Sequence, residues 1–203
     1  MKTRPAMYSR PAKPLTIPVR ARREAPNLEL AEAPEVIAVD RATECHVTPD
    51  PVARRMVEYL GPVGDYLTLE PSAGTGQLAR ALIAGGHSPQ ELTMIERHHA
   101  LAAALRKIGP TIHRCFLDYA EDVRGRAEFP RIIMNPPFRD VRKHFEAGLS
   151  LLGRGGHMEP ATLVALVPVT FEHPEAEQLE TLPPDTFSTA RVHTKIIRRS
   201  EER

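Results

Sequence analysis

The sequence predicts an α/β fold in which a mostly parallel sheet is flanked by helices on both faces. Two observations carry this prediction. From Thr48 onward, segments with helical periodicity alternate with short β-branched runs, which is the pattern of a parallel sheet covered by helices. A chain of 203 residues that is 41% hydrophobic and 26% charged also has the size and balance of one globular domain.

The first part of this region supplies three helix-strand pairs. Each apolar segment is bounded by residues that begin or end regular structure, such as proline after a threonine or paired glycines. In chain order we expect a helix opening at Pro49 and capped by Thr48, a strand over Tyr66–Leu69, a helix carrying Leu78, Leu82 and Ile83 and stopped by Gly85, a strand over Leu92–Ile95, a helix around Ala100–Lys107, and a strand over Thr111–Leu117.

The second part completes the sheet. The run Thr162–Val167 is continuously apolar, which is typical of a strand buried on both faces. Two short candidate strands near the C-terminus suggest an antiparallel hairpin at one edge, giving seven strands in all. The remaining expected elements are a strand over Arg131–Met134 that ends at the tetrapeptide NPPF, a helix over Val141–Leu152, a short helix near Glu175–Leu179, and the candidate strands Thr186–Ser188 and Val192–Ile197.

Residues 1–40 are expected to form an arm outside the domain that spans 41–203. Before Glu24 there are seven basic residues, no acid and four prolines. From Glu24 to Asp40 all the charged residues are acidic. Such a segment cannot bury enough apolar surface to fold by itself, so we expect it to be disordered or extended. Its basic half could follow a phosphate backbone.

The totals exclude several classes of protein. Cys45 and Cys115 are far apart and lack the spacing of a zinc site or a disulfide framework, so we expect buried thiols and no metal. The adjacent His98 and His99 are interpreted as surface residues. No apolar run is long enough to span a bilayer and no secretory signal is present, which predicts a cytoplasmic protein. The net charge of +1 gives no general nucleic-acid signature.

A glycine turn follows the first strand, at the edge of the sheet where ligands of such folds bind. Gly74 and Gly76 allow the backbone to approach a ligand closely. Glu70, Glu96 and Asp118 are each expected at the end of a strand on this edge. Three acids would repel a pyrophosphate, so the pattern favours a cationic nucleoside.

The tetrapeptide NPPF suits chemistry on an exocyclic amino group, whose delocalised lone pair makes it a poor nucleophile. The side-chain oxygen of Asn135 and the carbonyl of Pro136 can each accept one of its hydrogens and thereby aim the nitrogen. Pro136 and Pro137 stiffen the loop. Phe138 offers a ring on which an extruded base can stack.

With these two motifs, EPSAGTG and NPPF, the chain from about Cys45 onward resembles the class I S-adenosylmethionine-dependent methyltransferases, and among them the N6-adenine DNA methyltransferases with the gamma motif order. The resemblance implies a Rossmann-like fold and S-adenosylmethionine as cofactor. It also implies a catalytic set and a donor site: Asn135, Pro136, Pro137 and Phe138 for the acceptor; Glu70, Pro71, Ser72, Ala73, Gly74 and Gly76 in the donor loop; Thr48 toward the donor carboxylate; Glu96 on ribose; Asp118 on the adenine amino group; and Tyr119 or Ile95 on the adenine faces.

Several alternatives stay open. A planar amino nitrogen also occurs in RNA, as adenine N6 or guanine N2, and in a protein glutamine amide; a donor-binding subunit without catalysis is an alternative of another class. DNA is favoured over RNA. Only 65 residues follow Phe138, which leaves no clear target-recognition domain. The enzyme is then expected to have relaxed specificity, to borrow specificity from a partner subunit, or to act on structured RNA.

Overall fold

A computed structural model describes residues 47–187 and 192–201, and the structural statements below concern these ranges. The arm predicted for residues 1–40, together with Cys45, lies outside them.

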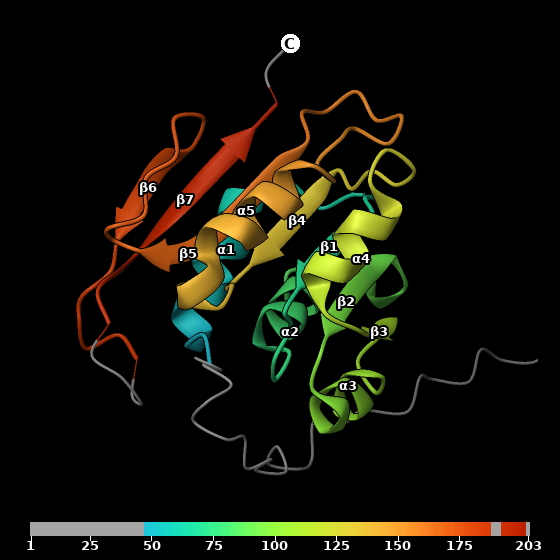
Figure 1. The fold of residues 1–203 in the computed structure, drawn as a ribbon, viewed down its shortest axis with the longest axis horizontal. Helices are drawn as coiled ribbons and strands as arrows, with labels where there is room; N and C mark the ends of the chain where they lie inside the picture. Colours follow the sequence, from blue (N-terminus) through green and yellow to red (C-terminus); the bar gives the residue numbers. More distant parts are fainter. Residues whose placement is uncertain (1–46, 188–191, 202–203) are drawn as a thin grey trace, which may run out of the picture. The chain divides into compact units, whose positions relative to one another are not determined.

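The described chain forms one seven-stranded sheet in the order β3-β2-β1-β4-β5-β7-β6 (Figure 1). Neighbouring strands from β3 to β5 are parallel, whereas β7 runs antiparallel to both β5 and β6. The predicted mostly parallel sheet with an antiparallel edge hairpin is therefore confirmed. The strands are Thr68–Pro71 (β1), Leu92–Glu96 (β2), Thr111–His113 (β3), Arg131–Met134 (β4), Thr162–Pro168 (β5), Glu177–Thr181 (β6) and Thr194–Ser200 (β7).

Helices cover both faces of the sheet, because the chain has to return to the starting edge of the sheet between parallel strands and does so through a helix packed on one face. In Figure 1, α5 lies in front of the strands and α1 behind them. Side chains of α1, α2 and α3 share one buried cluster, and those of α4 and α5 share another on the opposite face. The helices are Asp50–Leu60 (α1), Gln77–Ala84 (α2), His99–Leu105 (α3), Phe116–Val123 (α4) and Val141–Leu149 (α5), with short 3-10 turns at Pro89–Glu91 (η2) and Phe138–Asp140 (η3).

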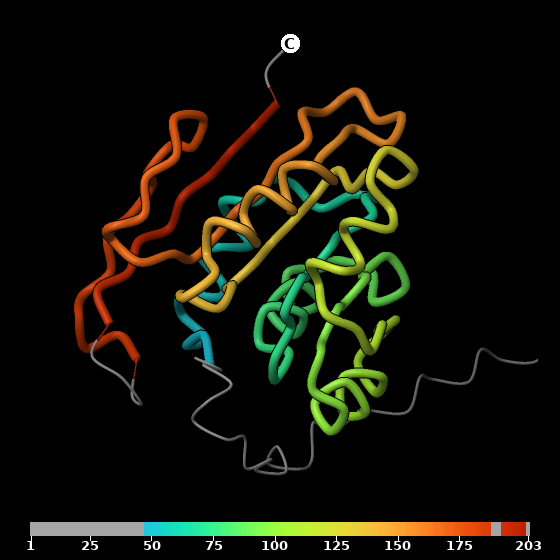
Figure 2. Tube along the Cα trace, in the orientation of Figure 1, coloured from blue at the N-terminus to red at the C-terminus, as the bar shows by residue number. Residues whose placement is uncertain are grey.

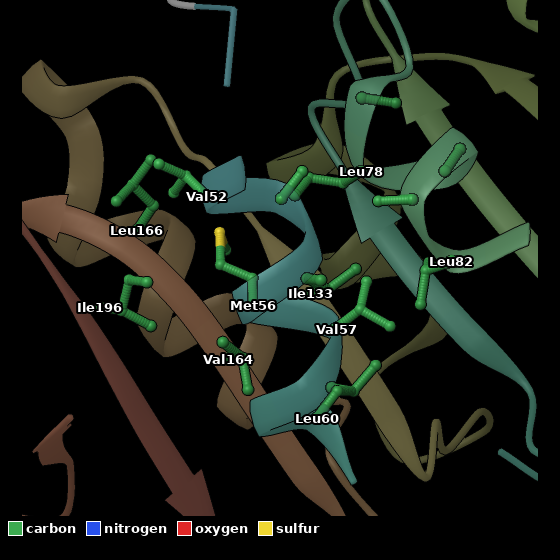
Figure 3. Packing of buried hydrophobic residues seen from close by; sticks show 14 of the residues in the cluster. Val52, Met56, Val57, Leu60, Leu78, Leu82, Ile133, Val164, Leu166 and Ile196 are labelled. Carbon is green, nitrogen blue, oxygen red and sulfur yellow. The ribbon is translucent and has the colours of Figure 1, made fainter. Parts of the chain in front are cut away.

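Helix α1 is fixed against the middle of the sheet by a stripe of apolar residues. Val52, Met56 and Leu60 recur every four positions, so they lie on one face of the helix, and each is at most 2% exposed. Figure 3 shows this face against Ile133 of β4 and Val164 of β5. The packing brings the start of α1 to the end of β4, where the site is found.

The chain order reverses between β1 and β4, and this reversal positions the site. From β1 the chain continues to β2 on one side, while β4 begins the other half of the sheet. Figure 2 traces this arrangement, with the β6–β7 hairpin in red at one side and β3 and α3 in green at the other. At such a switch point the helices diverge and leave a crevice at the carboxyl ends of the strands.

Three predicted elements differ from the structure. The third strand does not reach Leu117: β3 ends at His113, opposite Glu96 of β2, and the chain then turns so that Phe116 packs on the α4–α5 face. The helix expected near Glu175–Leu179 is instead the edge strand β6, because this segment hydrogen-bonds to β7.

The hairpin consequently begins earlier than predicted. Thr186, expected in a strand, lies in a bend, and Ser188 lies outside the described residues.

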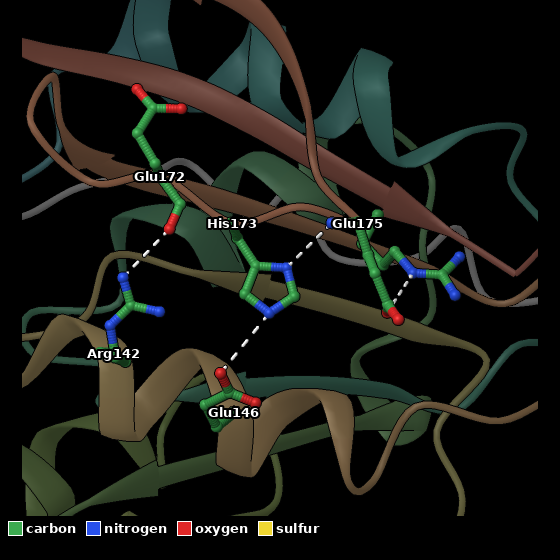
Figure 4. Close-up of polar contacts among 6 residues, drawn as sticks. Arg142, Glu146, Glu172, His173 and Glu175 are labelled. Atoms are coloured by element: carbon green, nitrogen blue, oxygen red, sulfur yellow. Dashed lines mark hydrogen bonds and ion pairs between the residues drawn. The ribbon is translucent and has the colours of Figure 1, made fainter.

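The segment between β5 and β6 is held over α5 by polar contacts (Figure 4). Arg142 donates to the carbonyl oxygen of Glu172 at 3.1 Å, and Nε2 of His173 lies 3.5 Å from a carboxylate oxygen of Glu146. The backbone N–H of Glu175 donates to the other ring nitrogen of His173 at 3.3 Å. These contacts give the loop that follows β5 a defined position beside the start of α5.

Candidate active site

A cavity of about 230 Å³ opens at the carboxyl edge of the sheet, at the switch point between β1 and β4. Its wall is built from the turn after β1, the end of β2, the segment that joins β3 to α4, and the segment that joins β4 to α5. Glu70, Glu96 and Asn135 all line it. The structure thus brings together residues that are far apart in the sequence.

The turn after β1 forms the floor of the cavity and departs from ordinary backbone geometry. Ser72, Gly74 and Gly76 have φ angles of 58°, 57° and 80°. A Cβ atom on Gly76 would lie 2.7 Å from a methyl carbon of Leu105, so both the φ angle and the close packing of α3 require glycine. Ala73 donates its backbone N–H to the carbonyl of Ile95 at 3.0 Å, which ties the turn to β2.

Glu70 is a buried carboxyl group at the end of β1. Its side chain is 2% exposed, and its Oε2 has no hydrogen-bond partner among the described residues. Burial raises the pKa of Glu70 to about 8; the backbone N–H of Ala79 and the charge of Arg80 oppose this shift in part. At neutral pH the group is mostly protonated, and a cationic ligand beside it would ionise it.

Glu96 is held in place by two backbone hydrogen bonds. Its Oε2 accepts from the N–H of Gly74 at 2.8 Å and its Oε1 from the N–H of His98 at 2.7 Å. The carboxylate is 6% exposed and therefore has a fixed orientation toward the cavity. Each oxygen keeps a further lone pair with which it can accept from a ligand hydroxyl.

Asn135 follows β4 directly and is bonded to a residue from the other end of the folded region. Its Nδ2 donates to Oγ1 of Thr48 at 3.0 Å. Thr48 is 3% exposed and is not the helix cap that we predicted, since Pro49 occupies the cap position and no side chain caps the helix. The bond fixes the amide with its nitrogen toward Thr48.

The other predicted site residues separate into two groups. Pro71 and Pro136 are buried beside the site, and Ser72, Ala73, Ile95 and Pro137 line the cavity. Asp118 and Tyr119 do not line it: both lie in α4 rather than at a strand end, and Asp118 is exposed. Phe138 is half-buried in η3 and also lies outside the lining.

Sequence reasoning missed several residues of the cavity. His98, which we expected at the surface, is half-buried and lines it, as does the half-buried Cys115. His144, in the first turn of α5, lines it with 7% exposure. The position of His144 in the first turn of the helix that follows NPPF is the only signal in the sequence, and periodicity does not distinguish it from a core residue.

Basic and amide side chains surround the mouth of the cavity. Arg97, Arg114 and Arg139 belong to the lining, and all three are exposed. Gln77, which is also in the lining, donates through Nε2 to Asp50 at 3.0 Å and joins the starts of α2 and α1. Cations at the rim and acids in the interior give the cavity two electrostatic zones.

Within residues 47–187 and 192–201, no group of three or more His, Cys, Asp or Glu side chains is arranged to hold a metal ion. No helix in the same ranges has the length and apolar character needed to cross a membrane.

Several solved structures that superimpose on this chain are described as methyltransferases. The 23S rRNA methyltransferase ErmE superimposes with a TM-score of 0.55 at 19% identity, over 80% of this chain and 69% of that one. A protein described as an RNA methyltransferase from Pyrococcus horikoshii gives 0.58 at 14% identity, over 81% and 91%. The chain has the Rossmann-like methyltransferase fold.

A third structure also superimposes on this chain. This protein, described as a modification subunit of a type I restriction enzyme from Vibrio vulnificus, gives a TM-score of 0.58 at 15% identity, over 76% of this chain and 44% of that one. No protein-family model and no curated protein matches the sequence. At 14 to 19% identity, these structures show a shared fold alone.

Proposed function

We propose that this chain transfers a methyl group from S-adenosylmethionine to an exocyclic amino nitrogen, with adenine N6 in DNA as the leading substrate. One observation supports this proposal above the others. Glu70, a buried carboxyl group whose Oε2 has no partner within the described ranges, and Asn135, an amide fixed by Thr48, line the same cavity. The first suits a cationic amino acid moiety and the second a planar amino group.

The donor half of the cavity fits S-adenosylmethionine. Glu70 would pair with the ammonium group of the methionine moiety, which compensates the cost of ionising a buried carboxyl group. Glu96 would accept from the ribose hydroxyls, and the turn through Gly74 gives close backbone approach. When bound, the donor supplies an electrophilic methyl group on a positively charged sulfur.

The acceptor half provides hydrogen-bond acceptors in place of a strong base. Because Nδ2 of Asn135 is directed at Thr48, the side-chain oxygen is the group that can accept from the substrate amino nitrogen. The Pro136 carbonyl can accept the second hydrogen, and this pair would hold the nitrogen lone pair toward the methyl group. Stacking of the substrate base on Phe138 stays a prediction.

Nucleic acid is the proposed substrate class because the rim and the structural neighbours both favour it. Exposed Arg97, Arg114 and Arg139 at the mouth would meet phosphates. Neighbours with the same fold include a 23S rRNA methyltransferase and the restriction-modification subunit. Methylation of an RNA base is therefore the second candidate.

The decisive experiment offers labelled S-adenosylmethionine to the full chain with duplex DNA, single-stranded DNA, RNA and total protein in parallel. We expect label in nucleic acid that nucleoside digestion identifies as N6-methyladenine. Asn135→Ala is the matched control and should bind the donor but transfer no label. Label confined to protein, or equal label from wild type and Asn135→Ala, would contradict the proposal.

A further inference from the structure

One end of the cavity is lined by three side chains that were not among the predicted site residues. His144 of α5 and Phe116 of α4 both line it, and their ring centroids are 5.8 Å apart. Arg97, which follows β2, is close enough for its charge to act on His144. Arg97 directly follows Glu96, the residue proposed to hold ribose, so this end adjoins the proposed ribose position.

The hydrogen bonding of His144 fixes which ring nitrogen remains to accept from a ligand. Nδ1 lies 3.1 Å from the carbonyl oxygen of Asp140. A carbonyl oxygen only accepts, so Nδ1 carries the hydrogen and Nε2 of the neutral ring is an acceptor. The Nδ1 bond also sets the rotation of the ring, so Nε2 is held in one direction.

The neutral form of His144 is the stable one. Burial lowers the pKa of His144, and the charges of Arg97 and Lys143 act in the same direction. The bond to the Asp140 carbonyl and the charge of Asp140 oppose this lowering in part. At neutral pH the ring therefore presents an acceptor and not a second donor.

The carboxylate predicted as the acceptor is not at this end of the cavity, and the carboxylate of Asp140, which does line the cavity, is paired with Lys143 at 3.0 Å. Asp118, predicted to accept from the adenine amino group, is exposed in α4 and outside the lining. The neighbouring lining residues Cys115 and Leu117 carry no strong acceptor in their side chains. A base attached to a ribose at Glu96 would instead meet His144.

We propose that His144 recognises the nucleobase of the donor by accepting, at Nε2, a hydrogen bond from the exocyclic amino group of adenine. This inference rests on the proposed function. Its consequence is selectivity, because a buried acceptor that loses its partner disfavours a purine without that amino group.

Calorimetric titration of the full chain tests this inference with two ligands, S-adenosylhomocysteine and its 6-deamino analogue, in which hydrogen replaces the amino group. Wild type should bind the amino form about tenfold more tightly. His144→Leu should bind both ligands about equally, because it removes both the bond to the amino form and the unpaired acceptor that disfavours the deamino form. His144→Gln keeps an acceptor oxygen near the position of Nε2 and should retain most of the preference.

His98→Leu is the matched control, since His98 is the second histidine of the cavity lining and its buried Nδ1 has no partner among the residues that the structure describes. It should leave the preference between the two ligands in place. Unchanged selectivity in a folded His144→Leu, or selectivity lost in His98→Leu instead, would overturn the assignment of His144. If wild type bound neither ligand, the proposed function itself would fail, and the two failures are thereby distinguishable.

Discussion

Donor binding should be coupled to the ionisation of Glu70. The pKa of Glu70 is raised to about 8, chiefly by burial, with the charge of Glu96 acting in the same direction and that of Arg80 against it. At pH 7 about 90% of the free protein therefore holds a proton on this group. The ammonium group of the donor has an ordinary pKa of about 7.8 and is also mostly protonated.

In the complex the two groups together hold one titratable proton, which is on the amine, because the carboxylate pairs with the ammonium. Binding at pH 7 should therefore release about 0.8 proton. The binding-competent fraction, with Glu70 ionised and the amine protonated, rises with pH. Affinity should increase about eightfold between pH 6 and pH 7 and a further two- to threefold to pH 8.

Calorimetry in buffers of different ionisation enthalpy counts the released protons directly. Glu70→Gln, which cannot ionise, should show an affinity that is nearly constant between pH 6 and pH 7 and a proton release close to zero. Glu175→Gln is the matched control, since Glu175 is exposed and lies outside the cavity lining. It should keep the wild-type pH dependence.

If Glu70→Gln retained the eightfold change in affinity, a group other than Glu70 would cause the pH dependence. A wild-type affinity that is flat between pH 6 and pH 7 would equally refute the prediction, since it would place the pKa of the free carboxyl group well below 6.

Three further predictions use other parts of the structure. Thr48→Val should lower turnover about tenfold at unchanged donor affinity, because the Thr48 hydroxyl acts through Asn135, and Thr48→Ser should keep wild-type turnover. A loss of donor affinity in Thr48→Val would instead indicate contact with the donor carboxylate. Gly76→Ala should lower the free energy of unfolding in urea by about 2 to 3 kcal/mol, because the position has a positive φ and the new methyl group would contact Leu105. Gly125→Ala, at a positive φ in open space, should lower it by about 1 kcal/mol. Equal losses would rule out the effect of the contact. The pKa of His87 is lowered, first by burial, so the unfolded chain binds a proton that the folded protein does not bind. Stability should be full above about pH 6.5 and decrease below it. In urea titrations at about pH 5 to 7, His87→Gln should flatten that decrease.

The central strands and the residues at their ends were predictable from the sequence. Arg131–Met134 and Thr162–Pro168 are buried on both faces, so their apolar runs match the structure within one residue. Glu70, Glu96 and Asn135 follow or end such strands, and the parallel arrangement alone brings them to one edge.

Tertiary structure decided the elements whose sequence has no strong periodicity. Glu177–Thr181 is mostly exposed, and only its pairing with β7 makes it a strand rather than a helix. The chain leaves β3 after His113 because Phe116 can be buried on the opposite face, and this turn carries Asp118 away from the cavity.

Contacts across long sequence separations also depended on the fold alone. The sequence determined that Thr48 precedes a helix and Asn135 follows a strand, but the packing of α1 on β4 brought their side chains to 3.0 Å. His144 entered the cavity for a similar reason, since one turn of α5 places it beside Phe116. Local patterns record burial and turns, whereas a hydrogen bond between distant residues depends on how whole elements pack, which no short stretch of sequence encodes.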